Sequence, residues 1–496
     1  MRQVLAIDEG TTGTTCLVVR EDGGIAGRGY REITQHFPRP GWVEHDAVEI
    51  WDRTLEAARE AVAAAGGSVD AIGVTNQRET VVVWERKSGR PIHRALVWQD
   101  RRTTARCAEL APRREEIAQR TGLVIDPYFS ATKLEWLLGQ PGVRERAERG
   151  ELAAGTIDSW LVWQLTGGDV HATDPTNASR TMLYDIDAGE WSEPLCQLFG
   201  VPMQMLPEVR ASSGDFGIAR GAPLGLARDV PVTGVAGDQQ SALFGQGCWS
   251  AGEGKNTYGT GAFLLLNTGS TRPPAGEDGL LTTIACDASG GPAFALEASI
   301  FIAGAAVQWL RDGLGLIGAA TETEAMAAGT ESTGGVYFVP ALTGLGAPHW
   351  EPNARGTITG LTRGTTREHI VRAALEAMAY GTADVLLTMK SRGGADFPRL
   401  RVDGGAAENG WLMQFQADVL GLPVERPDVV ETTALGAAGL AGLATGVWRS
   451  ADDFIARRTF TRFDPGARRE AAQAGAREWA RSVRTALSWA RDTGGQ

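Results

Sequence analysis

The chain has 496 residues, of which 43% are hydrophobic and 22% charged, and its formal net charge at pH 7 is −12. The length predicts roughly two to four domains, and the acidic balance argues against a nucleic-acid partner, whose phosphates bind Lys and Arg. Five scattered cysteines without C-x-x-C spacing, and six histidines without an H-E-x-x-H pair, argue against a disulfide framework and a zinc centre.

Targeting and membrane segments are not expected. The N-terminus carries only the apolar run Val4–Ile7 before Asp8, which is too short for a signal peptide. The longest weakly apolar stretches, residues 299–310 and 434–447, are predicted to be buried helices, because a membrane span needs about 20 apolar residues. We therefore expect a cytoplasmic protein with no membrane span, which also fits unpaired cysteines.

The first part of the chain alternates predicted strands, turns and helices. Strands are predicted at residues 4–7, 16–20, from 25 onward, 71–74 and 81–84, with a helix at 48–65. A turn rich in glycine and threonine, Asp8–Thr15, joins the first two strands. This alternation predicts an α/β layered architecture.

The strand–turn–strand pattern recurs near residue 260, where Gly259-Thr260-Gly261 lies between predicted strands at 255–258 and 263–266. A run of small residues precedes it. We predict a domain boundary in that run, near residue 248, which divides the chain into residues 1–247 and 248–496.

A long helix and a third turn follow. Thr365-x-x-Glu368 resembles a capping box, which predicts a helix that begins there and ends before Gly393. A short strand at 399–402 then leads into Asp403-Gly404-Gly405.

Three turns offer chemistry for phosphate, although the chain has no G-x-x-x-x-G-K-[ST] loop and no protein-kinase motifs. The turns at Asp8–Thr15, Gly259–Gly261 and Asp403–Ala406 present backbone N–H groups, and Asp8 has the hard oxygen atoms that Mg²⁺ prefers. Each of the first two turns alone is more often an ordinary hairpin, and the third, a predicted strand-to-helix turn, is also a weak signal alone. Three in this order indicate a nucleotide site.

Other residues have the chemistry to bind a polyol. Arg78 and Glu79 are adjacent after a strand, and such a pair donates and accepts hydrogen bonds with vicinal hydroxyls. Trp98 offers an apolar wall, and Asp238, on a loop between Gly237 and Gln239, suits a general base. A surface ion pair, a core tryptophan and a turn aspartate remain the alternative interpretations of these single residues.

Together these segments resemble the FGGY family of carbohydrate kinases from Val4 to about Trp448, and within it the members that phosphorylate glycerol. The matching motifs are PGWVEHD (Pro40–Asp46), TNQRET (Thr75–Thr80), VWQDRR (Val97–Arg102), GLVIDPYFS (Gly122–Ser130), TNASRTML (Thr176–Leu183), AGDQQ (Ala236–Gln240), KNTYGTG (Lys255–Gly261), and GTITGL with HIVRAALE between Gly356 and Glu376.

The resemblance implies two actin/hexokinase-like (ribonuclease H-like) α/β domains with ATP, Mg²⁺ and glycerol in the cleft between them. It implies a catalytic base at Asp238 and a residue near the metal at Asp8. The implied glycerol-binding residues are Arg78, Glu79, Trp98, Tyr128, Asp238, Gln239 and Phe263. The implied nucleotide-binding residues are Thr11, Thr12, Gly13, Thr260, Gly304, Gln308, Gly405 and Asn409.

The chain departs from the family pattern at a few positions. Many of the glycerol-phosphorylating members have Gln at the position of Glu9 and Arg at the position of Thr15, where the Arg contacts the nucleotide phosphates. Residues 217–230 match neither the loop that binds fructose 1,6-bisphosphate in some members nor the histidine that others present for phosphorylation. Both known routes of control are therefore in doubt.

Other functions stay open at this point. The chain is alternatively an FGGY kinase for erythritol, xylulose or gluconate, although Trp98 and Phe263 would have to make room for a larger sugar. It is alternatively a catalytically weak polyol sensor, which only Thr15 favours, or an actin-like ATPase, which would not need the polyol residues. The resemblance also implies a homo-oligomer, a dimer or a tetramer.

Overall fold

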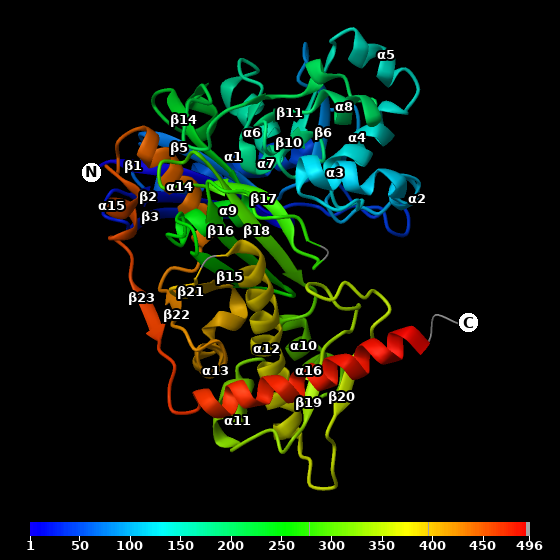
Figure 1. Cartoon of the computed structure of the whole chain (residues 1–496). Coiled ribbons are helices and arrows are strands. Elements are labelled where there is room, and N and C mark those ends of the chain that lie inside the picture. Colours follow the sequence, from blue (N-terminus) through cyan, green and yellow to red (C-terminus); the bar gives the residue numbers. More distant parts are fainter. Residues whose placement is uncertain (277, 395, 493–496) are drawn as a thin grey trace.

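Two large β-sheets form the framework of the molecule, a computed structural model that describes residues 1–276, 278–394 and 396–492 (Figure 1). The first sheet has the strand order β13 (Ile218–Ala219), β14 (Val230–Gly237), β5 (Ala71–Asn76), β1 (Gln3–Glu9), β2 (Gly13–Arg20) and β3 (Ile25–Glu32). Strand β1 pairs antiparallel with β2 and parallel with β5.

The second sheet repeats this arrangement. Its order is β17 (Leu281–Cys286), β18 (Pro292–Ile300), β16 (Ala262–Gly269), β15 (Gly254–Tyr258), β21 (Leu400–Asp403), β22 (Val424–Pro427) and β23 (Phe460–Phe463). Strand β15 pairs antiparallel with β16 and parallel with β21, as β1 does with β2 and β5. The predicted repetition of the first strand–turn–strand unit is therefore present.

Both faces of the first sheet are buried, which explains the continuous apolar run of its first strand. Leu5 and Ile7 pack in one cluster with helix α1 (Ala47–Ala64), whereas Val4 and Ala6 pack on the other face with helix α14 (Thr432–Ala444). Burying a valine, leucine or isoleucine side chain in this way stabilises the fold by about 1.5–3 kcal/mol. The C-terminal part of the chain thus supplies half of the cover for the first sheet.

Helix α9 (Asp238–Gly245) belongs to the N-terminal part of the chain but packs against the second sheet, whereas α14 belongs to the C-terminal part and packs against the first sheet. Both helices lie between the two sheets in Figure 1. Leu243 of α9 packs with Leu265 of the second sheet. The two helices touch backbone to backbone, because a Cβ atom on Gly436 would lie 1.8 Å from the carbonyl oxygen of Ser241. Only glycine permits this approach.

A third sheet of four strands lies in the N-terminal part, in the order β4 (Glu44–His45), β7 (Ala95–Leu96), β6 (Val81–Glu85) and β8 (Leu152–Thr156). The short strands pair as β9 (Ala172–Thr173) with β12 (Glu208–Val209), β10 (Tyr184–Asp185) with β11 (Glu190–Trp191), and β19 (Tyr337–Val339) with β20 (Thr357–Thr359). The remaining N-terminal helices are α2 (Thr104–Glu109), α3 (Arg114–Thr121), α4 (Ser130–Leu138), α5 (Val143–Glu148), α6 (Ile157–Thr166), α7 (Pro175–Ala178) and α8 (Glu193–Leu198).

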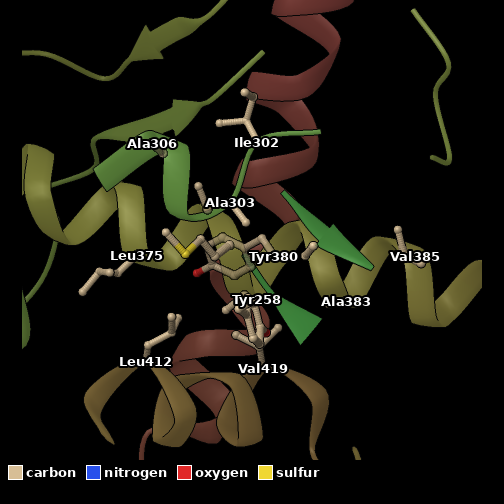
Figure 2. Close-up of a cluster of buried hydrophobic side chains, with 14 of the residues drawn as sticks. Tyr258, Ile302, Ala303, Ala306, Leu375, Tyr380, Ala383, Val385, Leu412 and Val419 are labelled. Carbon is tan, nitrogen blue, oxygen red and sulfur yellow. The ribbon is translucent and has the colours of Figure 1, made fainter. Parts of the chain in front are cut away.

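The largest apolar core lies between the second sheet and the helices that follow it, and Figure 2 shows part of it. These helices are α10 (Gly304–Gln308), α11 (Glu322–Gly329), α12 (Arg367–Gly393), α13 (Gly410–Leu420) and α16 (Arg469–Asp492), whereas α15 (Ala451–Ile455) packs in the cluster that holds α14. Trp479, Val483, Ala486 and Ala490 are buried at spacings of three and four residues, so one face of α16 seals this core.

Some local predictions are confirmed and others are wrong. The helix expected at 48–65 is α1, which begins one residue earlier because Asp46 caps it by accepting from two backbone N–H groups. The capping box of α12 is formed by Thr366 and His369, not by Thr365 and Glu368. The helix expected over 299–310 begins later than predicted, because Ser299 still pairs in β18 and α10 begins only at Gly304, from where helical turns continue to Gly313.

The apolar stretch at 434–447 is a buried helix, as predicted, since it coincides with most of α14. No helix within the described ranges combines the length and apolar character that a membrane crossing requires. Each of the five cysteines is buried and free of disulfide bonds. Burial raises the pKa of all five thiols, for example that of Cys107 to about 11.

Candidate active site

The first phosphate hairpin is tighter than predicted. Asp8 and Thr15 are strand residues that face each other across β1 and β2, and only residues 10–12 form the turn between the strands. Thr12 is exposed at the tip, whereas the hydroxyl of Thr11 accepts a hydrogen bond from the indole N–H of Trp98 at 2.9 Å. The predicted phosphate turn and the predicted polyol wall are therefore in direct contact.

Arg78 and Glu79 follow β5 and are both buried, so a surface ion pair is the wrong interpretation. The Nε atom of Arg78 lies 3.1 Å from Oδ1 of Asp238. Glu79 has a φ of 63°, a left-handed backbone conformation that costs a non-glycine residue roughly 1 kcal/mol or more. The surrounding contacts hold it there, including a hydrogen bond from the hydroxyl of Ser130 to the Glu79 carbonyl oxygen at 2.9 Å.

Two aromatic rings line this region. The rings of Trp98 and Tyr128 meet edge to face, with centroids 5.5 Å apart and an interplanar angle of 80°. Trp98 is half-buried, which distinguishes it from a fully buried core tryptophan such as Trp84. The burial of Tyr128 and the charge of Glu79 raise the pKa of its hydroxyl, which therefore stays protonated and able to donate a hydrogen bond.

Asp238 does not lie on a loop, which was the prediction, but begins helix α9 directly after the last residue of β14. Its side chain is 34% exposed, and its Oδ1 atom accepts the backbone N–H of Gln239 at 2.7 Å. A carboxylate in this position is fixed in direction and still accessible, which is what a general base requires.

Gln239 is oriented by Lys255, which stands in one of the quoted motifs but to which the sequence analysis assigned no role. Lys255 is fully buried on β15, and its Nζ atom donates to Oε1 of Gln239 at 2.6 Å and to the hydroxyl of Thr257 at 2.6 Å. A lysine only donates, so the amide oxygen of Gln239 must be the acceptor and the amide nitrogen faces elsewhere.

Phe263 lies on β16 in the second sheet, opposite Thr257 of β15. Leu265, two residues on, is opposite both Lys255 and Glu297, so these side chains share the sheet face of Phe263. That face is the one that meets Arg78, because Glu297 binds the Arg78 guanidinium. The two halves of the predicted polyol set, which are far apart in the sequence, are thereby brought to one region.

Sequence reasoning missed two charged residues in this region. Arg180 and Glu297 are fully buried and bind Glu79 and Arg78 respectively. Arg180 stands within a quoted motif, but no role was assigned to it. Glu297 carried one usable signal, because a carboxylate inside the apolar strand Pro292–Ile300 has to be paired.

The pKa values of the carboxylates in this region depend on whether an arginine lies beside them. Burial and the nearby charge of Asp238 raise the pKa of Asp8 to about 7, and burial also raises the pKa of Glu9 despite a hydrogen bond from Gln77. Burial would raise the pKa of Glu297 as well, but the charges of Arg180 and Arg78 outweigh it and lower that pKa to about 2. Glu297 is therefore a charged carboxylate in the folded protein.

A pocket of about 550 Å³ opens at the end of β15. All five nucleotide residues predicted in the second half of the chain line it, namely Thr260, Gly304, Gln308, Gly405 and Asn409. Thr11, Thr12 and Gly13 are not part of its wall and lie on the hairpin of the first sheet. Strand β15 runs for about 10 Å from Lys255 to its last residue, Tyr258, which lines the pocket.

Carboxylates that could hold a metal ion are sparse. The described residues contain no group of three or more His, Cys, Asp or Glu side chains arranged to do so. Asp8 and Asp238 are close enough for the charge of one to raise the pKa of the other. This donor set suits Mg²⁺, which takes one or two carboxylates together with substrate phosphates and water.

The positions that depart from the family pattern are also placed. Thr15 is half-buried beside Asp8, and its other neighbour in the sheet is Tyr30. In residues 217–230 the two arginines form exposed ion pairs, Arg220 with Asp169 at 2.6 Å and Arg228 with Asp70 at 3.1 Å.

Comparison with known proteins agrees with this architecture. The models of the FGGY family of carbohydrate kinases match the chain, the N-terminal domain over residues 3–245 and the C-terminal domain over residues 254–445. The chain belongs to this family, whose two-domain actin/hexokinase-like fold it adopts.

Curated relatives point to one branch of the family. The chain is 54% identical to a glycerol kinase of Dechloromonas aromatica over 99% of its own length and 98% of the relative. It is 52% identical to a glycerol kinase of Deinococcus radiodurans, again with 99% and 98% covered. The solved structure of Plasmodium falciparum glycerol kinase with ADP superposes with a TM-score of 0.93 at 36% identity, covering 98% of each chain.

Proposed function

We propose that the protein transfers the γ-phosphoryl group of ATP to glycerol and forms sn-glycerol 3-phosphate, with Asp238 as the general base. The observation that carries the proposal is the carboxylate of Asp238, accessible and 3.1 Å from Arg78, between the buried polyol residues and the strand that leads to the pocket. The full-length similarity to proteins named glycerol kinase supports glycerol as the acceptor.

Polar and apolar side chains divide the work of binding glycerol. Arg78, Glu79, Tyr128, Asp238 and Gln239 supply donors and acceptors for hydroxyl groups. Trp98 and Phe263 cover the carbon chain. Because three hydroxyls sit on three carbons in glycerol, a compact set of donors against two rings suits it better than a longer sugar, which would need the ring positions opened.

The nucleotide would occupy the 550 Å³ pocket in the second half of the chain. Thr260, Gly304, Gln308, Gly405 and Asn409 would contact it, and the backbone and hydroxyls of Thr11, Thr12 and Gly13 would hold its terminal phosphates. Backbone N–H groups at such turns bind anions without a net protein charge, which matters in a chain of charge −12.

Magnesium would be held by Asp8, directly or through water, together with the phosphates. When bound, Mg²⁺ neutralises the phosphate charge that builds up during transfer. Burial first, and the charge of Asp238 second, raise the pKa of Asp8, and a bound cation would counteract both by favouring the charged carboxylate.

In the transfer itself, Asp238 accepts the proton of the terminal glycerol hydroxyl as its oxygen attacks the γ-phosphorus. The new O–P bond forms while the bond to the ADP oxygen breaks, and glycerol 3-phosphate and ADP leave. Arg78 lies against both Asp238 and the buried network, so it fixes the direction of the base. Closure of the two halves over the substrates would exclude water and limit ATP hydrolysis.

The proposal includes a role in glycerol uptake and catabolism in the cytoplasm. A boundary near residue 248 and a dimeric or tetrameric assembly remain predictions.

The direct test is ADP release with Mg-ATP in a coupled assay, with glycerol, erythritol, xylulose, gluconate or no acceptor. We expect turnover that depends on glycerol, and a product that is identified as the sn-3 ester. Turnover only with another polyol would replace the acceptor and keep the reaction class. ADP release that is the same without an acceptor would replace the kinase with an ATPase or a sensor.

Asp238→Asn tests the base with little change of shape. Loss of a general base lowers kcat by about 10²–10⁴-fold, while glycerol still binds. Asp169→Asn, at the exposed ion pair with Arg220 outside the site, is the matched control and should keep wild-type turnover. Equal kcat values for Asp238→Asn and wild type would remove Asp238 from the chemistry.

A further inference from the structure

Four buried charges join the two halves of the chain beneath the polyol region. Arg78, Glu79 and Arg180 come from the first half, and Glu297 comes from β18 of the second sheet. Each of these side chains is at most 2% exposed. Two cations and two anions in so dry a place are stable only when they are paired in good geometry.

Glu297 makes the central pairing. Its Oε2 atom accepts from Nη1 of Arg78 at 2.6 Å and its Oε1 atom from Nη2 at 2.9 Å. Such a bidentate fork fixes the plane of the guanidinium as well as its position. Oε1 also accepts from Nη2 of Arg180 at 3.1 Å.

The fork decides which N–H groups of Arg78 remain for a ligand. Nε lies against Asp238 at 3.1 Å, and Nη1 also donates to Oε1 of Gln240 at 3.2 Å. A guanidinium has five N–H groups. Within the described residues, the second N–H on Nη2 has no protein acceptor, and Nε makes only ion-pair contacts, the shorter one with Asp238.

Glu297 acts on Glu79 through Arg180. Nε of Arg180 donates to Oε1 of Glu79 at 2.7 Å, and the same guanidinium is held by Glu297. The other carboxylate oxygen of Glu79, Oε2, has no hydrogen-bond donor in the part of the chain that the structure describes. Within the described residues, the second N–H on Nη2 of Arg78 and the Oε2 atom of Glu79 thus remain available to a ligand.

We infer that Glu297 is a positioning residue of the polyol site: it fixes Arg78 directly and Glu79 through Arg180, so that one N–H and one carboxylate oxygen are held out for neighbouring hydroxyls. This inference rests on the proposed polyol site. Because Glu297 belongs to the second sheet, the polyol site of the first half is correctly oriented only when the second half is docked against it.

The test compares Glu297→Gln with wild type in steady-state assays that vary glycerol and ATP separately. An amide keeps the shape but turns an NH₂ group toward a guanidinium, which breaks the fork. We expect the KM for glycerol to rise by about 10–100-fold, as for loss of a charged hydrogen-bond pair, and the KM for ATP to stay within about threefold.

A matched control separates positioning from general damage. Glu425 lies on β22 of the same sheet, is buried, and binds Arg401, Arg399 and Arg462 at 2.7, 3.3 and 3.0 Å. Glu425→Gln therefore breaks a similar arginine cluster on β22, which is separated by three strands from β18, the strand of Glu297. We expect it to lower the melting temperature as much as Glu297→Gln and to leave the KM for glycerol unchanged.

The decisive readout is non-additivity. In an Arg78→Lys background, Glu297→Gln should raise the KM for glycerol by clearly less than it does in wild type, because Arg78 is already lost and only the effect that reaches Glu79 through Arg180 remains. If Glu297→Gln does not fold, Glu297→Asp keeps the charge but is one methylene too short for the fork, and a smaller rise of about 3–10-fold is expected.

The inference would be overturned by an unchanged KM for glycerol, by equal rises for glycerol and ATP, by the same rise in Glu425→Gln, or by full additivity with Arg78→Lys. Failure of the proposed function shows in wild type instead. Wild type active only with another polyol would overturn glycerol as substrate, and the same variants are then compared with that polyol. Wild type inactive with every polyol would overturn both.

Discussion

The polyol region and the nucleotide pocket are lined by different kinds of residues. Around Arg78 the walls are long charged side chains, buried and paired with one another across the two sheets. Around Thr260 the wall combines glycine turns and small side chains with larger ones such as Gln308, Arg311 and Leu412. A small uncharged ligand with several hydroxyls needs fixed donors and acceptors, whereas phosphates are held by N–H groups at turns. Substitutions in the two regions should therefore act by different means.

The largest effect is expected at Arg78. Arg78→Lys keeps a positive charge but cannot form a fork with Glu297 while also reaching Asp238. We expect the KM for glycerol to rise by about 100-fold or more, with the KM for ATP within about threefold. Initial-rate kinetics with each substrate varied in turn measures both. A large rise in the KM for ATP would show that the two regions are not separable.

Glycines should dominate on the nucleotide side. A Cβ atom on Gly405 would meet nothing within 4 Å in the protein, so in Gly405→Ala the methyl group enters the pocket. We expect the KM for ATP to rise by about 3–10-fold at an unchanged melting temperature.

Its neighbour is the matched control. Gly404 has a φ of 83°, and a Cβ atom there would lie 2.3 Å from the carbonyl oxygen of Tyr258. Gly404→Ala should lower the stability by about 1–3 kcal/mol in thermal or urea unfolding. If Gly405→Ala instead raised the KM for glycerol, the pocket would not be the ATP site.

Lys255 should have a moderate effect on the polyol side. Lys255→Met keeps the length of the side chain but frees the amide of Gln239, which the lysine orients at 2.6 Å. A lost neutral hydrogen bond to glycerol corresponds to a rise in KM of about 3–10-fold. Glycerol saturation curves at fixed ATP test this. An unchanged KM for glycerol would mean that Gln239 does not contact the substrate.

The smallest effect on activity is expected from a buried carboxylate that has no arginine partner, because it acts on the stability of the fold instead. Asp158 is fully buried and accepts from the hydroxyls of Thr156 at 2.5 Å and Thr173 at 2.6 Å. Burial and the charge of Asp174 raise its pKa to about 7, in contrast with the arginine-bound Glu297.

The folded protein thus binds more protons at Asp158 than the unfolded chain does. This contribution to stability is complete below the unfolded pKa of 3.8 and is lost as the pH rises through about 7. In Asp158→Asn, the drop in unfolding free energy between pH 5 and pH 8 should shrink by about 2–3 kcal/mol. Asp52→Asn, at an exposed position, is the control, and an equal pH slope in wild type and Asp158→Asn would contradict the expectation.

The sequence predicted the parts of this molecule that are local. The two strand–turn–strand units and helix α1 follow from periodicity and turn residues within a short window. The capping box failed by one residue, because Thr365 and Thr366 carry the same side chain and only the backbone decides which of them caps α12. Ser299 was assigned to a helix because a run rich in Gly and Ala has no period that separates a strand end from a helix start.

The site was predictable where a motif carried it and not where it depends on a distant partner. Arg78, Trp98 and Asp238 stood in recognisable segments. Glu297 is 219 residues from Arg78, and no spacing within either strand reports that pairing. What could have been noticed is the mismatch itself, since a carboxylate in an apolar strand needs a cation from elsewhere in the fold.

The five buried cysteines can serve as probes of local unfolding in this protein. Thiolates react and thiols do not, and each of these thiols is both buried and held protonated, so a thiol-specific reagent has to wait for local unfolding. Cys16, Cys107 and Cys196 report on the first half, and Cys248 and Cys286 on the second. The order in which mass spectrometry finds them labelled would show which half opens first, and how far bound substrates delay it.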